Sequence, residues 1–271
     1  MTVGRALANA GLVPLDAQVL LAHVLKCDRA WLAAHAADAL PHEAADAFFA
    51  LSKRRRDGVP VAYLTGMREF WGLPLAVSSA VLIPRPETET VVELALARLP
   101  PDRELALLDL GTGSGALALA LAHERPRARV VATDTSTEAL AVAQANASGL
   151  QVGNVEFVQS DWYERLAGRR FDLIAANPPY VEPGDPHLCE GDVRFEPRSA
   201  LVPAGDGMAA LRTIVGGSRE HLAPGGTLVV EHGYDQSDVV RALFVESGFV
   251  AITTARDLAG IARVVAGRAP D

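Results

Sequence analysis

The fold is decided by residues 107–116, which read Leu-Leu-Asp-Leu-Gly-Thr-Gly-Ser-Gly-Ala. An apolar run leads into three alternate glycines, Gly111, Gly113 and Gly115, and a second apolar stretch follows at 117–122. This order predicts a buried strand, a tight glycine turn and a helix. Because glycines leave the backbone uncovered, a ligand can come close to it at the N-terminal end of the helix. We therefore expect a ligand site at this turn.

The next predicted strand supplies an acidic residue for the same ligand. Residues 129–133 form an apolar run that ends at Asp134. Asp134 stands 19 positions after Gly115 (134 − 115), the separation expected of an acid that binds the hydroxyl pair of a ribose. On these residues alone, a nicotinamide dinucleotide and S-adenosylmethionine are both possible ligands.

A second motif, Asn177-Pro178-Pro179-Tyr180, follows the apolar run 171–176. Two prolines cannot continue a strand, and Pro178 favours an extended conformation for Asn177. The amide oxygen of Asn177 and the carbonyl of Pro178 are two acceptors with restricted directions, and Tyr180 adds a flat aromatic face. Such a group suits a planar –NH2 substrate, although a plain proline turn at the end of a strand is the alternative.

The two motifs together resemble the class I S-adenosylmethionine-dependent methyltransferases. Further stretches narrow the resemblance to the peptide chain release factor glutamine N5-methyltransferases. These stretches are 63–66 (YLTG), 69–72 (EFWG), 81–89 (VLIPRPETE), 160–162 (SDW), 185–188 (DPHL), 192–198 (DVRFEPR) and 231–233 (EHG). The resemblance covers nearly the whole chain, and the block 81–89 is its most specific part.

The resemblance implies a reaction, a cofactor and a partner. It implies methyl transfer from S-adenosyl-L-methionine to the side-chain nitrogen of the glutamine in the Gly-Gly-Gln motif of class 1 peptide chain release factors, in support of translation termination. No metal is implied. The catalytic residues would be Asn177, Pro178 and Tyr180. The substrate-binding residues would be these three with Pro179 and Arg85. The cofactor-binding residues would be Gly111, Thr112, Gly113, Ser114, Gly115, Asp134, Asp161, Trp162 and Asn177.

Residues near the motifs carry more specific expectations. Asp161 can accept from the exocyclic amine of an adenine and Trp162 can stack on its ring, or the two can simply cap a helix and fill the core. Arg85 is a cation beside a predicted helix start, where an anion would be favoured. We therefore expect Arg85 to contact either the substrate chain or a buried carboxylate.

Three other functions compete with this one. An adenine-N6 methyltransferase of DNA or RNA shares Asn-Pro-Pro-Tyr, but it should need a basic groove, whereas this chain has a net charge of −8 from 25 basic and 33 acidic side chains. A nicotinamide-dependent dehydrogenase would account for 111–134 but not for 177–180. A non-catalytic module of the same fold would not need both motifs intact.

The pattern of elements predicts an α/β fold with a Rossmann-like, mostly parallel sheet of seven strands. The strands are expected at 105–110, 129–133, 155–158, 171–176, 226–231, 249–254 and 262–266. The helices are expected at 115–124, 136–147, 208–222 and 236–247. By analogy with class I methyltransferases, one strand near the edge should be antiparallel.

Three parts of the chain are expected. Residues 1–59 should form a helical domain that docks the substrate protein, 60–83 a β-hairpin connector, and 84–271 the catalytic domain. In the first part, Asp16 is expected to cap a helix, and the basic run 53–56 either complements a helix dipole or contributes to docking. Residues 181–206 should form a long loop that shapes the substrate entrance.

Composition gives the remaining expectations. Apolar residues make up 49% of the 271 residues, enough for a sizeable core. The two cysteines, Cys27 and Cys189, have no metal-ligand spacing and suit a reducing compartment. The chain shows neither a signal-peptide pattern nor a run of about 18 uncharged apolar residues. We expect a cytoplasmic monomer with no membrane contact and no direct nucleic-acid partner.

Overall fold

The computed structural model describes all residues from Met1 to Asp271, and they form two compact units. The first comprises Met1–Met67 and Pro186–Phe195, and the second comprises Arg68–Asp185 and Glu196–Asp271. Each unit has its own hydrophobic core. No helix is both long and apolar enough to cross a membrane.

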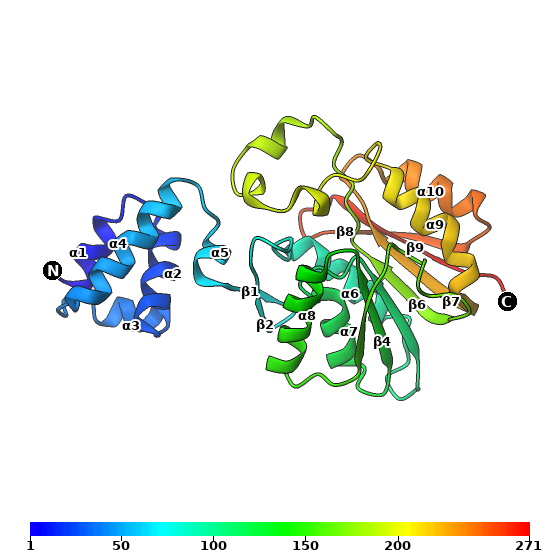
Figure 1. Cartoon of the computed structure of the whole chain (residues 1–271), viewed down its shortest axis with the longest axis horizontal. Coiled ribbons are helices and arrows are strands. Elements are labelled where there is room, and N and C mark those ends of the chain that lie inside the picture. Colours follow the sequence, from blue (N-terminus) through cyan, green and yellow to red (C-terminus); the bar gives the residue numbers. More distant parts are fainter. The chain divides into compact units, whose positions relative to one another are not determined.

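The first unit is helical (Figure 1). Its helices are α1 (Val3–Ala8), α2 (Pro14–Leu25), α3 (Arg29–Ala34), α4 (His42–Arg56) and α5 (Val61–Thr65). Leu20, Leu21, Leu32 and Phe48 are almost completely buried between them. Their burial explains why short, alanine-rich helices that would be marginal in isolation are stable here.

Asp16 does not cap α2, contrary to the sequence-based expectation. The helix begins at Pro14 with Val13 as its N-cap, three residues before the expected cap, because the fixed φ of proline suits the first helical position. Asp16 lies in the first turn, where its carboxylate accepts a hydrogen bond from Arg55 Nε at 2.6 Å. The ion pair joins α2 to α4.

The basic run 53–56 is divided between internal contacts and solvent. Arg55 also donates to Asp192 Oδ1 at 2.6 Å, and Arg56 donates to the carbonyl of Ala10. Lys53 and Arg54 are exposed. Two of the four cations therefore hold the first unit together, and two are available at its surface.

The segment 181–206 is not an irregular loop throughout. It contains the short 3₁₀ helices η2 (Pro186–Cys189), η3 (Val193–Phe195) and η4 (Arg198–Ala200). Its central part belongs to the first unit, where Asp192 binds Arg55 and Arg194 donates to the carbonyl of Asp57 at 2.9 Å. These contacts join residues more than 130 positions apart and cannot be derived from local sequence patterns.

The predicted hairpin consists of β1 (Met67–Phe70) and β2 (Leu73–Ala76). Phe70 is buried in the core of the second unit. The Asn146 side chain accepts from Ala76 N at 2.7 Å and donates to Ala76 O at 3.0 Å. The hairpin is therefore bound to the second unit and does more than connect two domains.

The second unit contains a seven-stranded sheet with the order β5-β4-β3-β6-β7-β9-β8. Its strands are β3 (Ala106–Leu110), β4 (Arg129–Asp134), β5 (Val155–Gln159), β6 (Phe171–Ala176), β7 (Leu222–Glu231), β8 (Val250–Arg256) and β9 (Ala262–Arg268). The pairs from β5 to β7 are parallel, and β9 is antiparallel to both of its neighbours. The predicted fold class is confirmed.

Helices cover both faces of this sheet (Figure 1). They are α6 (Glu89–Leu96), which follows the 3₁₀ turn η1 (Pro86–Thr88), α7 (Ala116–Glu124), α8 (Thr137–Gly149), α9 (Ala209–His221) and α10 (Ser237–Glu246). Leu107 and Leu173 pack with α6 and α7, whereas their neighbours Leu108 and Ile174 pack with α9 and α10. Since alternate residues of a strand point to opposite faces, both faces of each central strand are apolar.

The two motifs meet where the strand order reverses. β3 lies between β4 and β6, and Leu110 of β3 is paired with Ala176 of β6. The glycine turn follows Leu110, and Asn177 follows Ala176. Parallel α/β sheets bind ligands at this position, beyond the carboxyl ends of the strands.

Candidate active site

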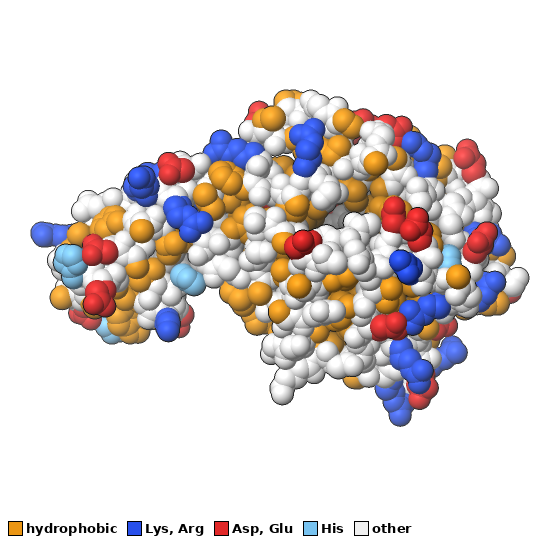
Figure 2. Space-filling model, viewed as in Figure 1, with side chains coloured by type: hydrophobic (Ala, Val, Ile, Leu, Met, Phe, Trp, Pro, Cys, Tyr) orange, Lys and Arg blue, Asp and Glu red, His pale blue; other side chains and the backbone are white.

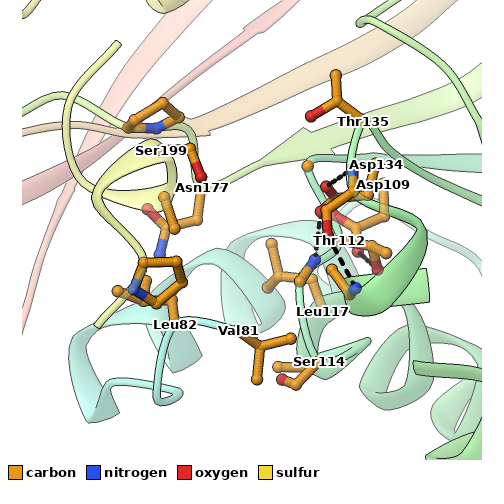
Figure 3. Close-up of a pocket in the computed structure, with 18 of the residues that line it drawn as sticks. Val81, Leu82, Asp109, Thr112, Ser114, Leu117, Asp134, Thr135, Asn177 and Ser199 are labelled. Carbon is orange, nitrogen blue, oxygen red and sulfur yellow. Dashed lines mark hydrogen bonds between the residues drawn. The ribbon is translucent and has the colours of Figure 1, made fainter. Parts of the chain in front are cut away.

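A cavity of about 360 Å³ lies at this edge of the sheet, entirely within the second unit. Figure 3 shows Asn177, Leu82 and Ser199 on one side, with Asp109, Thr112 and Asp134 across from them. The residues that line it include Val81, Leu82, Arg85, Thr88, Asp109, Gly111, Thr112, Gly113, Ser114, Asp134, Trp162, Asn177, Pro179, Pro197, Ser199 and Ala200. Residues far apart in the sequence thus form one site.

The glycine turn has the backbone that its sequence predicts. Gly111, Gly113 and Gly115 have φ values of 72°, 55° and 86°, in the left-handed region that favours glycine. A Cβ at Gly115 would lie 3.0 Å from Leu119 Cδ1 and 3.2 Å from Ala143 Cβ. The third glycine is therefore also needed for close packing between helices.

Asp134 fixes the turn from the neighbouring strand. Its Oδ2 accepts from Gly113 N at 2.9 Å, and its Oδ1 accepts from Ser136 N at 2.9 Å. The side chain lines the cavity and is partly exposed. This position suits the ribose-binding role that the sequence predicts for Asp134. The role itself stays a prediction.

Asp109 is a site residue that the sequence does not identify. Its Oδ2 accepts from the Thr112 hydroxyl at 2.6 Å and from Ala118 N at 3.1 Å, while Oδ1 is buried without a hydrogen-bond partner. Burial raises the pKa of this carboxyl to about 7, and the two donors oppose the rise. The one sequence feature that could have pointed to Asp109 is that an acidic residue stands inside an apolar strand next to a glycine turn.

The Asn-Pro-Pro-Tyr motif contributes two of its four residues to the cavity wall. Asn177 and Pro179 line it, whereas Pro178 and Tyr180 are not among the lining side chains. Asn177 Nδ2 donates to the Thr88 hydroxyl oxygen at 2.9 Å. This bond directs the NH2 group of Asn177 towards Thr88 and leaves Oδ1 free to accept a hydrogen bond.

Tyr180 does not present its aromatic face to the cavity. Its ring packs against the core on the α9 and α10 side of the sheet. Its hydroxyl donates to Glu231 Oε1 at 3.0 Å, and burial, followed by the charge of Glu231, raises the pKa of Tyr180. The tyrosine thus joins the motif to the end of β7.

Arg85 lines the cavity, but its guanidinium binds a buried carboxylate. It forms an ion pair with Glu196, whose side chain is fully buried, and Glu196 Oε2 also accepts from Ile83 N at 3.1 Å. Of the two contacts expected for Arg85, the structure contains the one to a carboxylate. The pair fixes Pro197 next to the segment that precedes α6.

Trp162 and Asp161 are in different positions. Trp162 lines the cavity, and a Cβ at Gly111 would lie 3.6 Å from its ring. Asp161 is exposed and lines a neighbouring hollow together with Arg198 and Thr213. The structure therefore brings Trp162, but not Asp161, into the cavity with the glycine turn.

Comparison with known proteins identifies the class to which the fold belongs. Residues 87–190 match the family model of the methyltransferase small domain, and residues 3–66 match that of the PrmC N-terminal domain. A methyltransferase from Pyrococcus furiosus superposes with a TM-score of 0.55 at 18% identity, covering 74% of this chain and 90% of that one. The fold and these matches define an S-adenosylmethionine-dependent methyltransferase of class I.

Curated relatives specify the family. The release factor glutamine methyltransferase of Xylella fastidiosa (strain Temecula1) is 53% identical over 94% of this chain and 93% of its own length. The protein of the same name from Escherichia coli (strain K12) is 49% identical over 93% of this chain and 91% of its own length. The chain belongs to the release factor glutamine methyltransferase family. The dehydrogenase alternative is thereby excluded.

Proposed function

We propose that this enzyme methylates the side-chain amide nitrogen of the glutamine in the Gly-Gly-Gln motif of class 1 peptide chain release factors. The proposal rests mainly on the orientation of the Asn177 amide at the cavity. Its nitrogen donates to Thr88, and its oxygen is free to accept. The family membership supports the same substrate. The reaction would take place in the cytoplasm, where release factors act, with the enzyme as a monomer.

The cavity has the features that S-adenosylmethionine requires. The left-handed glycine turn leaves room for a ligand against the start of α7, and the carboxylates of Asp134 and Asp109 lie on the same side. Asp109 Oδ1, buried without a partner, is a free acceptor for a cationic or N–H group. When bound, S-adenosylmethionine supplies an electrophilic methyl group.

The difficulty of the reaction lies in the nucleophile, because the lone pair of a carboxamide nitrogen is delocalised into its carbonyl. Asn177 Oδ1 and the Pro178 carbonyl would each accept one N–H of the substrate amide. Two fixed acceptors would orient the nitrogen towards the methyl donor and favour the geometry in which its lone pair is available. No strong base is needed, since the nitrogen becomes acidic when it is methylated.

The first unit would dock the release factor. It contains no part of the cavity, so its function should concern recognition and not chemistry. Lys53 and Arg54, the exposed members of the basic run that make no side-chain hydrogen bond, would contribute to this surface. Arg55 is occupied by Asp16 and Asp192 and would act structurally.

The substrate class is tested by radiolabelled methyl transfer to a purified class 1 release factor and to a variant in which the motif reads Gly-Gly-Ala. We expect one methyl per molecule on the first protein and none on the second. Equal labelling of both would contradict the proposal.

The same experiment should also test nucleic acid as an alternative methyl acceptor. On the face that Figure 2 shows, Lys and Arg side chains are interspersed with Asp and Glu on both units, which does not suit a polyanion. Adenine-containing duplex DNA and single-stranded RNA should therefore accept no methyl group. Labelling of either one in preference to the release factor would favour the adenine methyltransferase.

A further inference from the structure

Glu231 is a buried carboxylate that the proposed reaction does not use directly. It ends β7, with 1% of its surface exposed, and is not among the residues that line the cavity. Its Oε1 accepts from the Tyr180 hydroxyl, and its Oε2 is buried without a hydrogen-bond partner. An ionisable group in this position needs an explanation, since an uncompensated buried charge is costly.

Thr88 connects this carboxylate to Asn177. Thr88 is 4% exposed, and its oxygen accepts from Asn177 Nδ2 at 2.9 Å. A hydroxyl has one proton, which must then be donated in another direction. The acceptor available for that proton is Glu231 Oε2, which is buried and unpartnered. The register that pairs Ala176 with Val230 brings Asn177 and Glu231, the next residue of each strand, to the same edge of the sheet, and Thr88 lowers the pKa of Glu231.

The direction of these bonds determines which end of the Asn177 amide faces the cavity. If Thr88 donates its proton to the unpartnered Glu231 Oε2, the Thr88 oxygen is left to accept, so Asn177 turns its nitrogen to Thr88, as observed, and its oxygen to the substrate. If Thr88 instead donated to Asn177, the amide would turn over and present its NH2 group. Two donors would then meet at the substrate nitrogen.

We propose that Glu231, acting through Thr88, is a positioning residue that fixes the orientation of the Asn177 carboxamide, so that its oxygen receives the N–H of the substrate amide. This inference rests on the proposed function. Tyr180, which donates to the same carboxylate, fixes the other end of the motif. The motif therefore depends on two residues outside it, one before the catalytic sheet and one at the end of β7.

The proposed chain of hydrogen bonds from Glu231 through Thr88 to Asn177 should depend on pH. A protonated Glu231 carboxyl has its own proton to donate and no longer requires one from Thr88. The pKa of Glu231 is raised to about 7, because burial, with a smaller contribution from Glu87 of η1, outweighs the lowering by Thr88, Tyr180 and Arg263 of β9. His232, next to Glu231 in the chain, has its pKa lowered by burial. The kcat of the wild type should therefore fall as the pH decreases below 7.

The test compares four variants in the full-length enzyme with release factor as substrate. Thr88→Val keeps the shape but removes the hydroxyl, and Thr88→Ser restores the hydroxyl. Glu231→Gln places an amide donor where the carboxylate accepted. Thr90→Val, two residues further along, is the matched control, because it lies outside the cavity lining.

We expect Thr88→Val and Glu231→Gln to lower kcat by about 10-fold to 100-fold, the range of one buried hydrogen bond. Affinity for S-adenosylmethionine, measured by calorimetry, should change less than about threefold. Thr88→Ser should recover most of kcat, Thr90→Val should match the wild type, and Glu231→Gln should lack the loss of kcat below pH 7.

Two results would overturn the inference. One is a Thr88→Val enzyme that keeps kcat within about threefold of the wild type. The other is a Thr88→Ser enzyme as poor as Thr88→Val, which would mean that the site needs the threonine methyl group and not the hydroxyl. A wild type that leaves the release factor unmethylated would instead contradict the proposed function, so the two failures are distinguishable.

Discussion

The two sides of the cavity are built in different ways. On the glycine-turn side, the ligand surface is mainly backbone, and the residues that shape it, Gly111 to Gly115, are contiguous. On the Asn-Pro-Pro-Tyr side, the decisive group is one side-chain amide. Its nitrogen donates to Thr88, 89 positions away, and in the proposed arrangement Thr88 in turn donates to Glu231.

This difference separates binding from chemistry. A backbone surface needs only the correct φ values and persists when a neighbouring side chain changes. An amide side chain has two ends of similar shape and opposite hydrogen-bonding character, so a correct position is insufficient without a partner that fixes its orientation. Damage to the first side should therefore weaken cofactor affinity, and damage to the second should lower turnover.

The largest effect is expected at Asn177. Asn177→Ala should lower kcat by roughly 10²–10³, because a preorganised acceptor is lost at the reacting nitrogen. Asn177→Asp should be nearly as poor, since it cannot donate to Thr88 and its charge favours other partners. Single-turnover methylation at saturating S-adenosylmethionine measures both, with circular dichroism as the control for folding. An Ala variant with more than about a tenth of the wild-type rate would leave the motif as a plain proline turn.

On the opposite side, Asp134→Ala should reduce affinity for S-adenosylmethionine by about 1–3 kcal/mol, the cost of leaving polar groups without their charged acceptor. At saturating cofactor, kcat should stay within a few-fold of the wild type. Isothermal titration gives the affinity, and the Asn177→Ala enzyme is the matched control, because its affinity should be nearly unchanged. If the two variants exchanged these phenotypes, the separation of binding from chemistry would be wrong.

Asp109 predicts a dependence of stability on pH. Its pKa in the folded protein, about 7, is above the ordinary value of 3.8, so the folded state keeps a proton that the unfolded chain releases. The free energy of unfolding should therefore decrease as the pH rises from about 4 to about 7, at about 1 kcal/mol per pH unit from this group.

Urea unfolding at pH 5 and pH 6 checks this prediction. Asp109→Asn cannot titrate and should show a smaller decrease between the two pH values than the wild type. The decrease that remains should include the contribution of Glu231, whose pKa burial raises in the same direction. An equal decrease in the two proteins would show that Asp109 is ionised throughout.

The smallest effect is expected in the first unit. Arg54→Glu should raise KM for the whole release factor by about twofold to fivefold, because one exposed charge contributes little to an interface. KM for a short Gly-Gly-Gln peptide should not change. Arg103→Glu, an equal change of charge on an exposed residue of the second unit, is the control. If the two variants raised KM for the release factor equally, the basic run would have no specific role in docking.

Local sequence patterns predict much of the fold. Alternating apolar strands and helices predict the elements of the second unit to within a few residues, and the start of β7 at Leu222 shows the largest difference. The contact between α4 and the residue that precedes η3, by contrast, depends on the ion pair Arg55–Asp192, which no local pattern encodes. The start of α2 was missed because Pro14 determines it more strongly than the capping ability of Asp16.

The candidate site follows the same rule. The glycine turn and Asn177 are recognisable because each stands in a short motif with a stated geometry. Thr88, Asp109 and Glu231 also lie in quoted stretches, but their roles are not recognisable there, because those roles arise from burial and from the partners that the fold supplies. Tyr180 is recognisable as part of the motif, but its direction, away from the cavity and towards Glu231, required the structure.

The central claim is that the methyl group is transferred to a carboxamide nitrogen held by Asn177. The most direct measurement uses a release factor whose glutamine side chains are labelled with ¹⁵N, treated with enzyme and S-adenosylmethionine and examined by tandem mass spectrometry and NMR. We expect one added methyl, bonded to the ¹⁵N of the Gly-Gly-Gln glutamine. A methyl group on an oxygen, on a backbone nitrogen or on another residue would contradict it.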